Sequence, residues 1–262
     1  MAIPIPSDFD FRTIPLDDNE IFIRDQLGLN IDHWARFRHA IGIGLDADNL
    51  HGEHGAPVTE NVKSAYRELG KSHYEVVTSL GYIALSLDLA RNSQENLLMF
   101  QKSCKDFYFH TGCLLDNLAR LIYILNDPGS ASELYRQQVP MRHYIGWGQL
   151  KGYSGHNRAM RSEKLRGIKN IRNCLTHSWK IPFRIDQHDN MYWPLAVRSD
   201  KSFLWPYDEP EFKRRYRKWI PILPMMESDL RFLEGFQDER FRRLIKDISQ
   251  FESSNKVKIS EP

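Results

Sequence analysis

The sequence contains few cysteines and no long apolar run, and both absences restrict its class. Its 262 residues include three cysteines, Cys104, Cys113 and Cys174. Because this number is odd and the spacing fits no zinc motif, we predict reduced thiols in or near the core. No apolar stretch approaches the roughly 20 residues that span a bilayer, and residues 1–10 lack the basic and apolar segments of a signal peptide. We therefore expect a cytoplasmic protein with no membrane association.

Common cofactor and metal motifs are also missing. Gly42-Ile43-Gly44 has neither the spacing nor the lysine of a phosphate-binding loop, and no Gly-x-Ser-x-Gly elbow occurs. His51 and His54 lie close together in a polar loop without a third ligand nearby, which favours solvated histidines over a metal site. We predict no cofactor and no metal. A metal enzyme that uses His51, His54 and acidic residues is kept as a third hypothesis.

Charge is distributed unevenly along the chain. The formal net charge is only +2, but Lys and Arg outnumber Asp and Glu by 17 to 7 over residues 141–220. Over residues 1–140 the acids are in excess, 19 to 12. A basic block in a nearly neutral chain indicates an anionic partner, or alternatively a solvated Lys- and Arg-rich face.

Hydrophobic periodicity predicts a mainly α fold. Apolar residues recur at helical spacing over Thr59–Arg91, and a near-heptad stripe follows from Leu97 to Leu125. Arg91-Asn92-Ser93 offers an N-cap for the second helix, and Asn126-Asp127-Pro128-Gly129 is a strong stop signal. Two long helices joined in this way predict an up-and-down helical bundle.

The flanking segments have weaker patterns. We predict a loop-rich N-terminal extension over residues 1–56 with one short helix at Asp32–Ile41, and a helical domain over residues 57–252. Within that domain a short helix is expected near Ala131–Gln138. A basic helix is expected over His156–Trp179.

Alternating apolar and polar residues over 181–206 predict a small β-hairpin or a three-stranded patch. Asp208-Glu209-Pro210 is typical of a helix start, so the chain is expected to be helical from there to about Phe251, with breaks near Pro221 and Pro224. Residues 253–262 are expected to form a disordered tail.

The segment Arg172-Asn173-Cys174-Leu175-Thr176-His177 contains the residues with the clearest chemistry. It resembles the ribonuclease motif of the HEPN superfamily, in which Arg is followed after four to six residues by His, often with Asn directly after the Arg. A looser pair with the same spacing range, Arg67 and His73, is expected by chance in a chain of this composition. The asparagine therefore gives the match most of its specificity.

The motif suits RNA cleavage without a metal. The RNA 2′-OH attacks the adjacent phosphorus, and this attack needs a base and an acid, which histidine supplies near neutral pH. It also needs donors on the phosphate oxygens, which the arginine fork provides. The resemblance therefore implies that Arg172 and His177 are catalytic and that Asn173 supports them. Asp116, a polar residue among leucines in the middle of a predicted helix, is either a further supporting residue that reaches the motif helix or a polar position on the exposed side.

The resemblance further implies a homodimer with a composite site, and an RNA substrate. Basic residues near the motif are candidate RNA contacts, and aromatic residues of the Phe212–Trp219 run are candidates for base stacking, unless that run is an amphipathic helix with a charged outer face. The candidate contacts are Lys164, Arg166, Lys169, Arg214 and Arg215.

Two functions follow from these patterns. The first is a metal-independent endoribonuclease, a toxin or anti-phage effector with an antitoxin or defence-system partner. The alternative is a non-catalytic HEPN-like module that binds RNA or a protein. In that case the three motif residues are structural. Arg172 forms a salt bridge, Asn173 forms a cap or turn, and His177 lies at a helix end where the helix dipole favours it.

Overall fold

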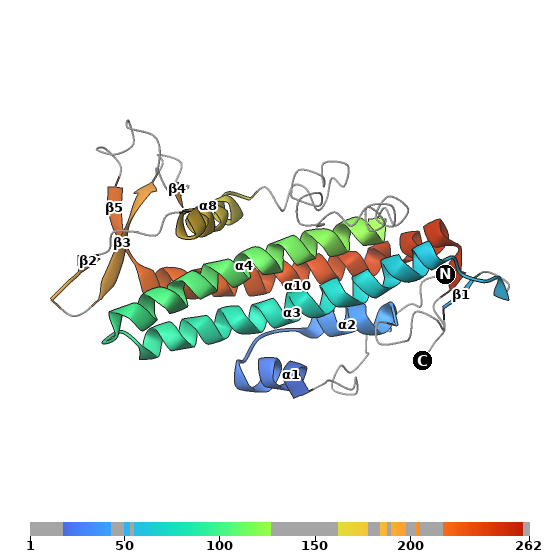
Figure 1. The fold of residues 1–262 in the computed structure, drawn as a ribbon, viewed down its shortest axis with the longest axis horizontal. Coiled ribbons are helices and arrows are strands. Elements are labelled where there is room, and N and C mark those ends of the chain that lie inside the picture. Colours follow the sequence, from blue (N-terminus) through green and yellow to red (C-terminus); the bar gives the residue numbers. More distant parts are fainter. Residues whose placement is uncertain are drawn as a thin grey trace. The chain divides into compact units, whose positions relative to one another are not determined.

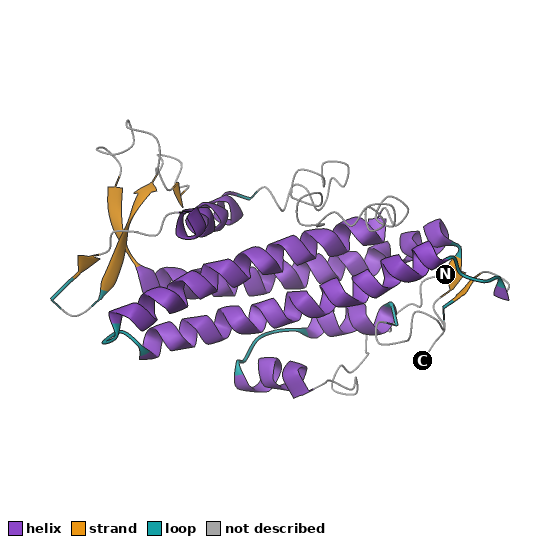
Figure 2. Ribbon diagram, viewed as in Figure 1, coloured by secondary structure: helices purple, strands orange, loops and turns teal. Residues whose placement is uncertain are grey.

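The protein has a mainly α fold with a small antiparallel sheet, as predicted (Figures 1 and 2). The structure is a computed structural model that describes residues 18–42, 50–52, 55–126, 162–177, 184–187, 190–197, 203–204 and 217–258. The predicted short helix near 131–138 and the loop residue His54 lie outside these ranges. Within them, no helix combines the length and the apolar character needed to cross a membrane.

The two predicted long helices are confirmed as α3 (Glu60–Asn92) and α4 (Leu97–Asn126). The predicted cap of α4 is wrong, because Asn96 performs this function. The Asn96 side-chain oxygen accepts the Met99 amide at 3.2 Å, and its backbone oxygen accepts the Phe100 amide at 2.9 Å. The hydroxyl of Ser93 instead donates to the Leu89 carbonyl and so closes the end of α3.

The third long helix, α10 (Ile222–Asn255), begins later than expected. The prediction of helix before it is wrong for β5 (Arg217–Pro221), which is a strand. Apolar and polar residues over so few positions fit either period, so pairing with a neighbouring strand decides the conformation. Pro224 lies in the first turn of α10, where the missing amide proton removes no helical hydrogen bond.

The C-terminal residues up to Lys258 are ordered, so the predicted disordered tail is wrong over 253–258. Helix α10 continues to Asn255, and Lys256 then adopts a φ of 50°. This left-handed residue reverses the chain after the helix. It leads into β6 (Val257–Lys258), which pairs antiparallel with β1 (His51–Gly52).

The second sheet confirms the predicted patch near 181–206 and adds one strand. Its central strand β3 (Met191–Val197) pairs with β2 (Arg184–Ile185) and β4 (Phe203–Leu204). It also pairs with β5, all antiparallel. The predicted turn lies between β2 and β3, where Asp186 Oδ1 accepts the amide of Asn190 at 3.0 Å.

The chain forms two compact units, each of which includes segments of the three long helices. The first unit is built from the described residues of 1–78, 114–157 and 234–262. The second is built from those of 79–113 and 158–233.

The N-terminal segment belongs to the core of the first unit. It forms α1 (Asp18–Ile21), the π-helical turn η2 (Phe22–Gln26) and α2 (Asp32–Ala40). The last of these confirms the predicted helix. The prediction of loops is therefore wrong over residues 18–26, where α1 and η2 form.

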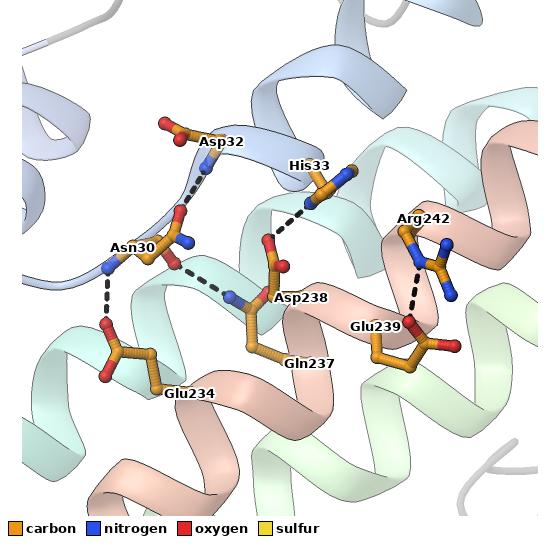
Figure 3. Close-up of polar contacts among 8 residues, drawn as sticks. All are labelled: Asn30, Asp32, His33, Glu234, Gln237, Asp238, Glu239 and Arg242. Atoms are coloured by element: carbon orange, nitrogen blue, oxygen red, sulfur yellow. Dashed lines mark hydrogen bonds and ion pairs between the residues drawn. The ribbon is translucent and has the colours of Figure 1, made fainter.

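Polar contacts fix α2 and its leading residues on α10 (Figure 3). Glu234 Oε1 accepts the backbone amide of Asn30 at 2.6 Å, and Gln237 donates to the Asn30 carbonyl at 2.9 Å. His33 Nδ1 lies 2.8 Å from Asp238 Oδ1. Each backbone group of Asn30 thus has a partner before the helix begins.

A stacked aromatic cluster fills the core under α2. The Trp34 ring lies 4.3 Å from the His73 ring at an interplanar angle of 12°. The indole of Trp34 donates to the His73 carbonyl at 3.0 Å. Phe37 and Phe241 contact the same imidazole. Burial of His73 lowers its pKa from 6.5 to about 3, because the charged ring would lose its hydration.

This burial predicts an acid-sensitive fold. The folded-state pKa of His73 is below its ordinary value, so between about pH 6.5 and 3 the unfolded chain binds one more proton. As the pH is lowered through this range, His73 alone should therefore reduce the free energy of unfolding by up to about 1.4 kcal/mol per pH unit. The His73→Gln variant should lose this part of the slope in urea titrations from pH 7 to 4.

Phe37→Leu is the matched control, because it disturbs the same cluster but keeps the imidazole. It should lower stability at every pH by about 1–2 kcal/mol and keep the wild-type slope. Equal slopes in wild type and His73→Gln would show that His73 is not the buried neutral group described here.

Candidate functional site

The motif lies on α8 (Glu163–His177), a helix of the second unit. Ser162 begins it, since its backbone oxygen accepts the Arg166 amide at 3.0 Å and its hydroxyl accepts the Leu165 amide at 3.4 Å. The predicted basic helix at 156–179 is confirmed over Glu163–His177. One face of α8 is buried; its apolar residues are Leu165, Ile168 and Ile171.

Arg172 is half-buried and packs on α4 at Gly112. A Cβ atom placed on Gly112 would lie 2.8 Å from Nε of Arg172 and 3.3 Å from Cζ. The absence of a side chain at Gly112 therefore makes room for the guanidinium. Arg172 Nη1 also donates to Asn173 Oδ1 at 3.3 Å, which joins the first two residues of the motif.

His177 is the last residue of α8. It follows Asn173 by four residues, the spacing that puts two positions on the same face of a helix. The side chains of Cys174 and His177 lie outside the described part of the structure. The structure therefore brings Arg172 and Asn173 together and places the backbone of His177 one turn further on.

The looser pair, Arg67 and His73, has a structural role. Arg67 forms an ion pair with Glu60 at 2.6 Å on the surface of α3. His73 is fully buried against Trp34, where its pKa is lowered to about 3 by burial. A buried imidazole with this pKa does not exchange protons with a substrate at neutral pH, so this pair has no acid–base function.

A polar cluster that the sequence analysis missed fixes the start of α8. Asp229 of α10 is 2% exposed and forms an ion pair with the ammonium of Lys164. Tyr108 of α4 donates its hydroxyl to the same carboxylate at 2.8 Å. Burial raises the pKa of Asp229, whereas Lys164 and Tyr108 act in the opposite direction. The pKa of Tyr108 is raised well above its usual value, first by burial and then by this carboxylate.

One sequence signal could have identified Asp229. It lies on the helical stripe of α10 that also contains the buried residues Ile222, Met226 and Leu233. A single acid on an apolar stripe indicates a buried ion pair, because an unpaired buried carboxylate is too costly. Gly112 gave no comparable signal, since its contact depends on the packing of two helices.

The predicted RNA contacts differ in their surroundings. Lys164 is engaged with Asp229, and its Nζ also lies 3.4 Å from Ser228 Oγ. Arg166 and Lys169 are exposed on α8, and Arg166 lies 3.9 Å from Glu163. Arg214 and Arg215 lie outside the described residues.

Asp116 lies on α4 with a half-buried side chain, in the first unit, whereas α8 belongs to the second. Its supporting role stays a prediction. Among the described residues, no three histidine, cysteine, aspartate or glutamate side chains gather in a way that could hold a metal ion.

Comparisons with known proteins found no similar one. No family model matches the chain, and no match was found among curated proteins or solved structures. The resemblance to the HEPN superfamily therefore depends on the motif and on the helical setting described above.

The contact between Gly112 and Arg172 predicts a difference between two glycine substitutions. Nothing lies within 4 Å of a Cβ at Gly235, an exposed glycine of α10. Gly235→Ala should therefore raise the free energy of unfolding by about 0.5–1 kcal/mol through helix propensity. Gly112→Ala should not give this gain, because the guanidinium of Arg172 must move.

Combining Gly112→Ala with Arg172→Ala isolates the cause. Once the guanidinium is removed, Gly112→Ala should stabilise the protein about as much as Gly235→Ala does. Urea denaturation of the four proteins of this cycle measures the coupling. Additive effects of the two substitutions would contradict the contact.

Proposed function

We propose that the protein is a metal-independent endoribonuclease of HEPN type, with Arg172 and His177 as its catalytic residues. The observation that supports this most is the placement of Arg172. Its guanidinium lies in the space that Gly112 leaves and is hydrogen-bonded to Asn173, on a helix that ends at His177. A fork held in this way loses less conformational freedom when it binds a phosphate than a free surface arginine does.

The proposed reaction uses the RNA itself as the nucleophile. The 2′-oxygen forms a bond to the adjacent phosphorus while the bond from phosphorus to the 5′-oxygen breaks. One imidazole accepts the proton of the 2′-OH, and an acid gives a proton to the departing 5′-oxygen. The products are a 2′,3′-cyclic phosphate and a free 5′-OH, and no metal takes part.

Arg172 acts in this scheme on the phosphate. As the non-bridging oxygens gain charge in the transition state, its N–H donors stabilise them. Asn173 accepts one donor of the fork at 3.3 Å and so sets its orientation.

A single histidine supplies a base or an acid, but one imidazole does not act as both in the same step. We therefore propose that two copies of the chain face each other and form one composite site with two motifs. Such an enzyme would be toxic to the cell that makes it. This agrees with a toxin or anti-phage effector that is held inactive by an antitoxin or another defence-system partner.

The half-buried position of Arg172 also favours a second candidate function. An arginine that fills the space beside a glycine stabilises helix packing whether or not it touches a substrate. In this case the protein is a non-catalytic module that binds RNA or a partner protein through its basic residues.

Cleavage of total RNA in EDTA separates the two functions. The wild-type protein should cut, and Arg172→Ala and His177→Ala should each lower the rate by roughly 10²- to 10⁴-fold, since each removes a transition-state interaction. Lys102→Ala is the matched control, because this lysine is exposed on α4 of the same unit and is not among the candidate RNA contacts. It should keep most of the activity.

The product ends and the folded state complete this experiment. The ends should be 2′,3′-cyclic phosphates, and circular dichroism should show all variants folded. If wild type cuts and both motif variants cut equally well, the assignment of the catalytic residues is wrong. If wild type binds RNA with steep salt dependence but never cuts, the non-catalytic module is the correct function.

A further inference from the structure

The described side chains of the four-stranded sheet of the second unit divide between a face against the helices and an outer face. On β3, Met191 and Trp193 are buried, and the ring of Trp193 lies 5.9 Å from that of Tyr108 on α4. Side chains alternate between the faces of a strand, so Tyr192 belongs to the opposite face. This outer face is the surface considered below.

The strand register places Arg184, Tyr192 and Pro221 in one row across the outer face. Arg184 of β2 pairs directly with Tyr192 of β3, and Pro221 of β5 pairs with Tyr192 from the other side. Trp219 precedes Pro221 by two residues and is therefore the diagonal neighbour of Tyr192, at a typical distance of roughly 7–8 Å. Trp219 and Tyr192 thus form a diagonal aromatic pair, and Arg184 lies on the other side of Tyr192.

Trp219 is unusually open for its size. Its side chain is 44% exposed, although the indole ring is among the largest apolar groups a protein can bury. Arg184 is also exposed, and Tyr192 is half-buried. An exposed aromatic residue on β5 and an arginine on β2, across the central strand, offer a stacking surface and a phosphate contact together.

The charges on this sheet favour a polyanion. Arg184 is an exposed base of this sheet, while the acid of the turn, Asp186, is already engaged. Its two oxygens accept hydrogen bonds from Asn190 and from the Tyr192 hydroxyl, the latter at 2.9 Å. The same hydrogen bond fixes the Tyr192 phenol and raises its pKa.

We propose that the outer face of this sheet binds single-stranded RNA, with an unpaired base stacked on Trp219 and a phosphate on Arg184. The identity of the ligand as RNA rests on the proposed function. Bases in a duplex are stacked on one another and do not expose their faces, so the surface selects unpaired segments. Strand β4 packs against α8, so the sheet belongs to the same unit as the motif and adjoins the motif helix (Figure 1).

Binding to a protein that cannot cleave tests this surface without relying on catalysis. The full-length His177→Ala protein is titrated into a fluorescein-labelled 12-nucleotide single strand, and anisotropy gives Kd. Adding Trp219→Ala or Trp219→Leu should raise Kd roughly 5- to 150-fold, the range expected for loss of one base stack. Trp219→Phe should keep most of the affinity, because it keeps an aromatic face.

Phe109→Ala is the matched control. Phe109 is 53% exposed on α4 in the same unit but has no place in the sheet. It should leave Kd unchanged. Arg184→Gln should lower the slope of log Kd against log salt by about 0.7, the contribution of one phosphate contact on a single strand, whereas the Trp219 variants should keep the slope.

The outcomes separate this inference from the proposed function. If Trp219→Ala and Trp219→Leu bind as tightly as the parent, or if a duplex of the same sequence binds as well as the single strand, the stacking surface is refuted, even if wild type cleaves RNA. If binding depends on Trp219 while wild type fails to cleave, the surface stands and the ribonuclease proposal falls. Absence of any RNA binding refutes the surface.

Discussion

The position of the motif helix depends on the interactions of one buried carboxylate, that of Asp229. It connects three helices, because α10 supplies it, Tyr108 of α4 donates to it and Lys164 of α8 pairs with it. A carboxylate that is 2% exposed would cost several kcal/mol without such partners. The pair therefore fixes the first turn of α8. Since Arg172 follows Lys164 by two helical turns, the same contact determines where the motif lies against α4.

Helices with a sustained period could be predicted from the sequence, and short elements could not. The apolar stripes of α3 and α4 extend over about eight turns each, so their bounds were found within a few residues. Strand β5 has five residues and exists because β3 pairs with it, which no local pattern reveals. Similarly, β6 is ordered by pairing with β1, more than two hundred residues earlier. Both predictions were wrong because each strand is stabilised by a partner that is distant in the sequence.

The chemistry of the candidate site could be proposed from the sequence, whereas its surroundings could not be predicted. Arg172, Asn173 and His177 stand out as candidates because their residue types and spacing are specific. Gly112, which makes room for the arginine, and Asp229, which fixes the helix, come from other helices and could not be connected with the motif. Among the described residues of the basic block 141–220, Lys164 stabilises the fold, whereas Arg184 is exposed on the sheet that also contains Trp219. Charge alone does not separate these uses, since burial determines them.

The central claim is that the RNA's own 2′-OH attacks the phosphorus while the motif of α8 assists. The most direct measurement is cleavage in EDTA of a short single-stranded RNA in which the nucleotide 5′ of a mapped cleavage site carries a 2′-deoxy sugar. This linkage should resist the enzyme, because it lacks the 2′-OH, while neighbouring linkages should be cut at their usual rates. Cleavage of the deoxy linkage as fast as its ribose counterpart would contradict the mechanism, because another nucleophile would then be at work.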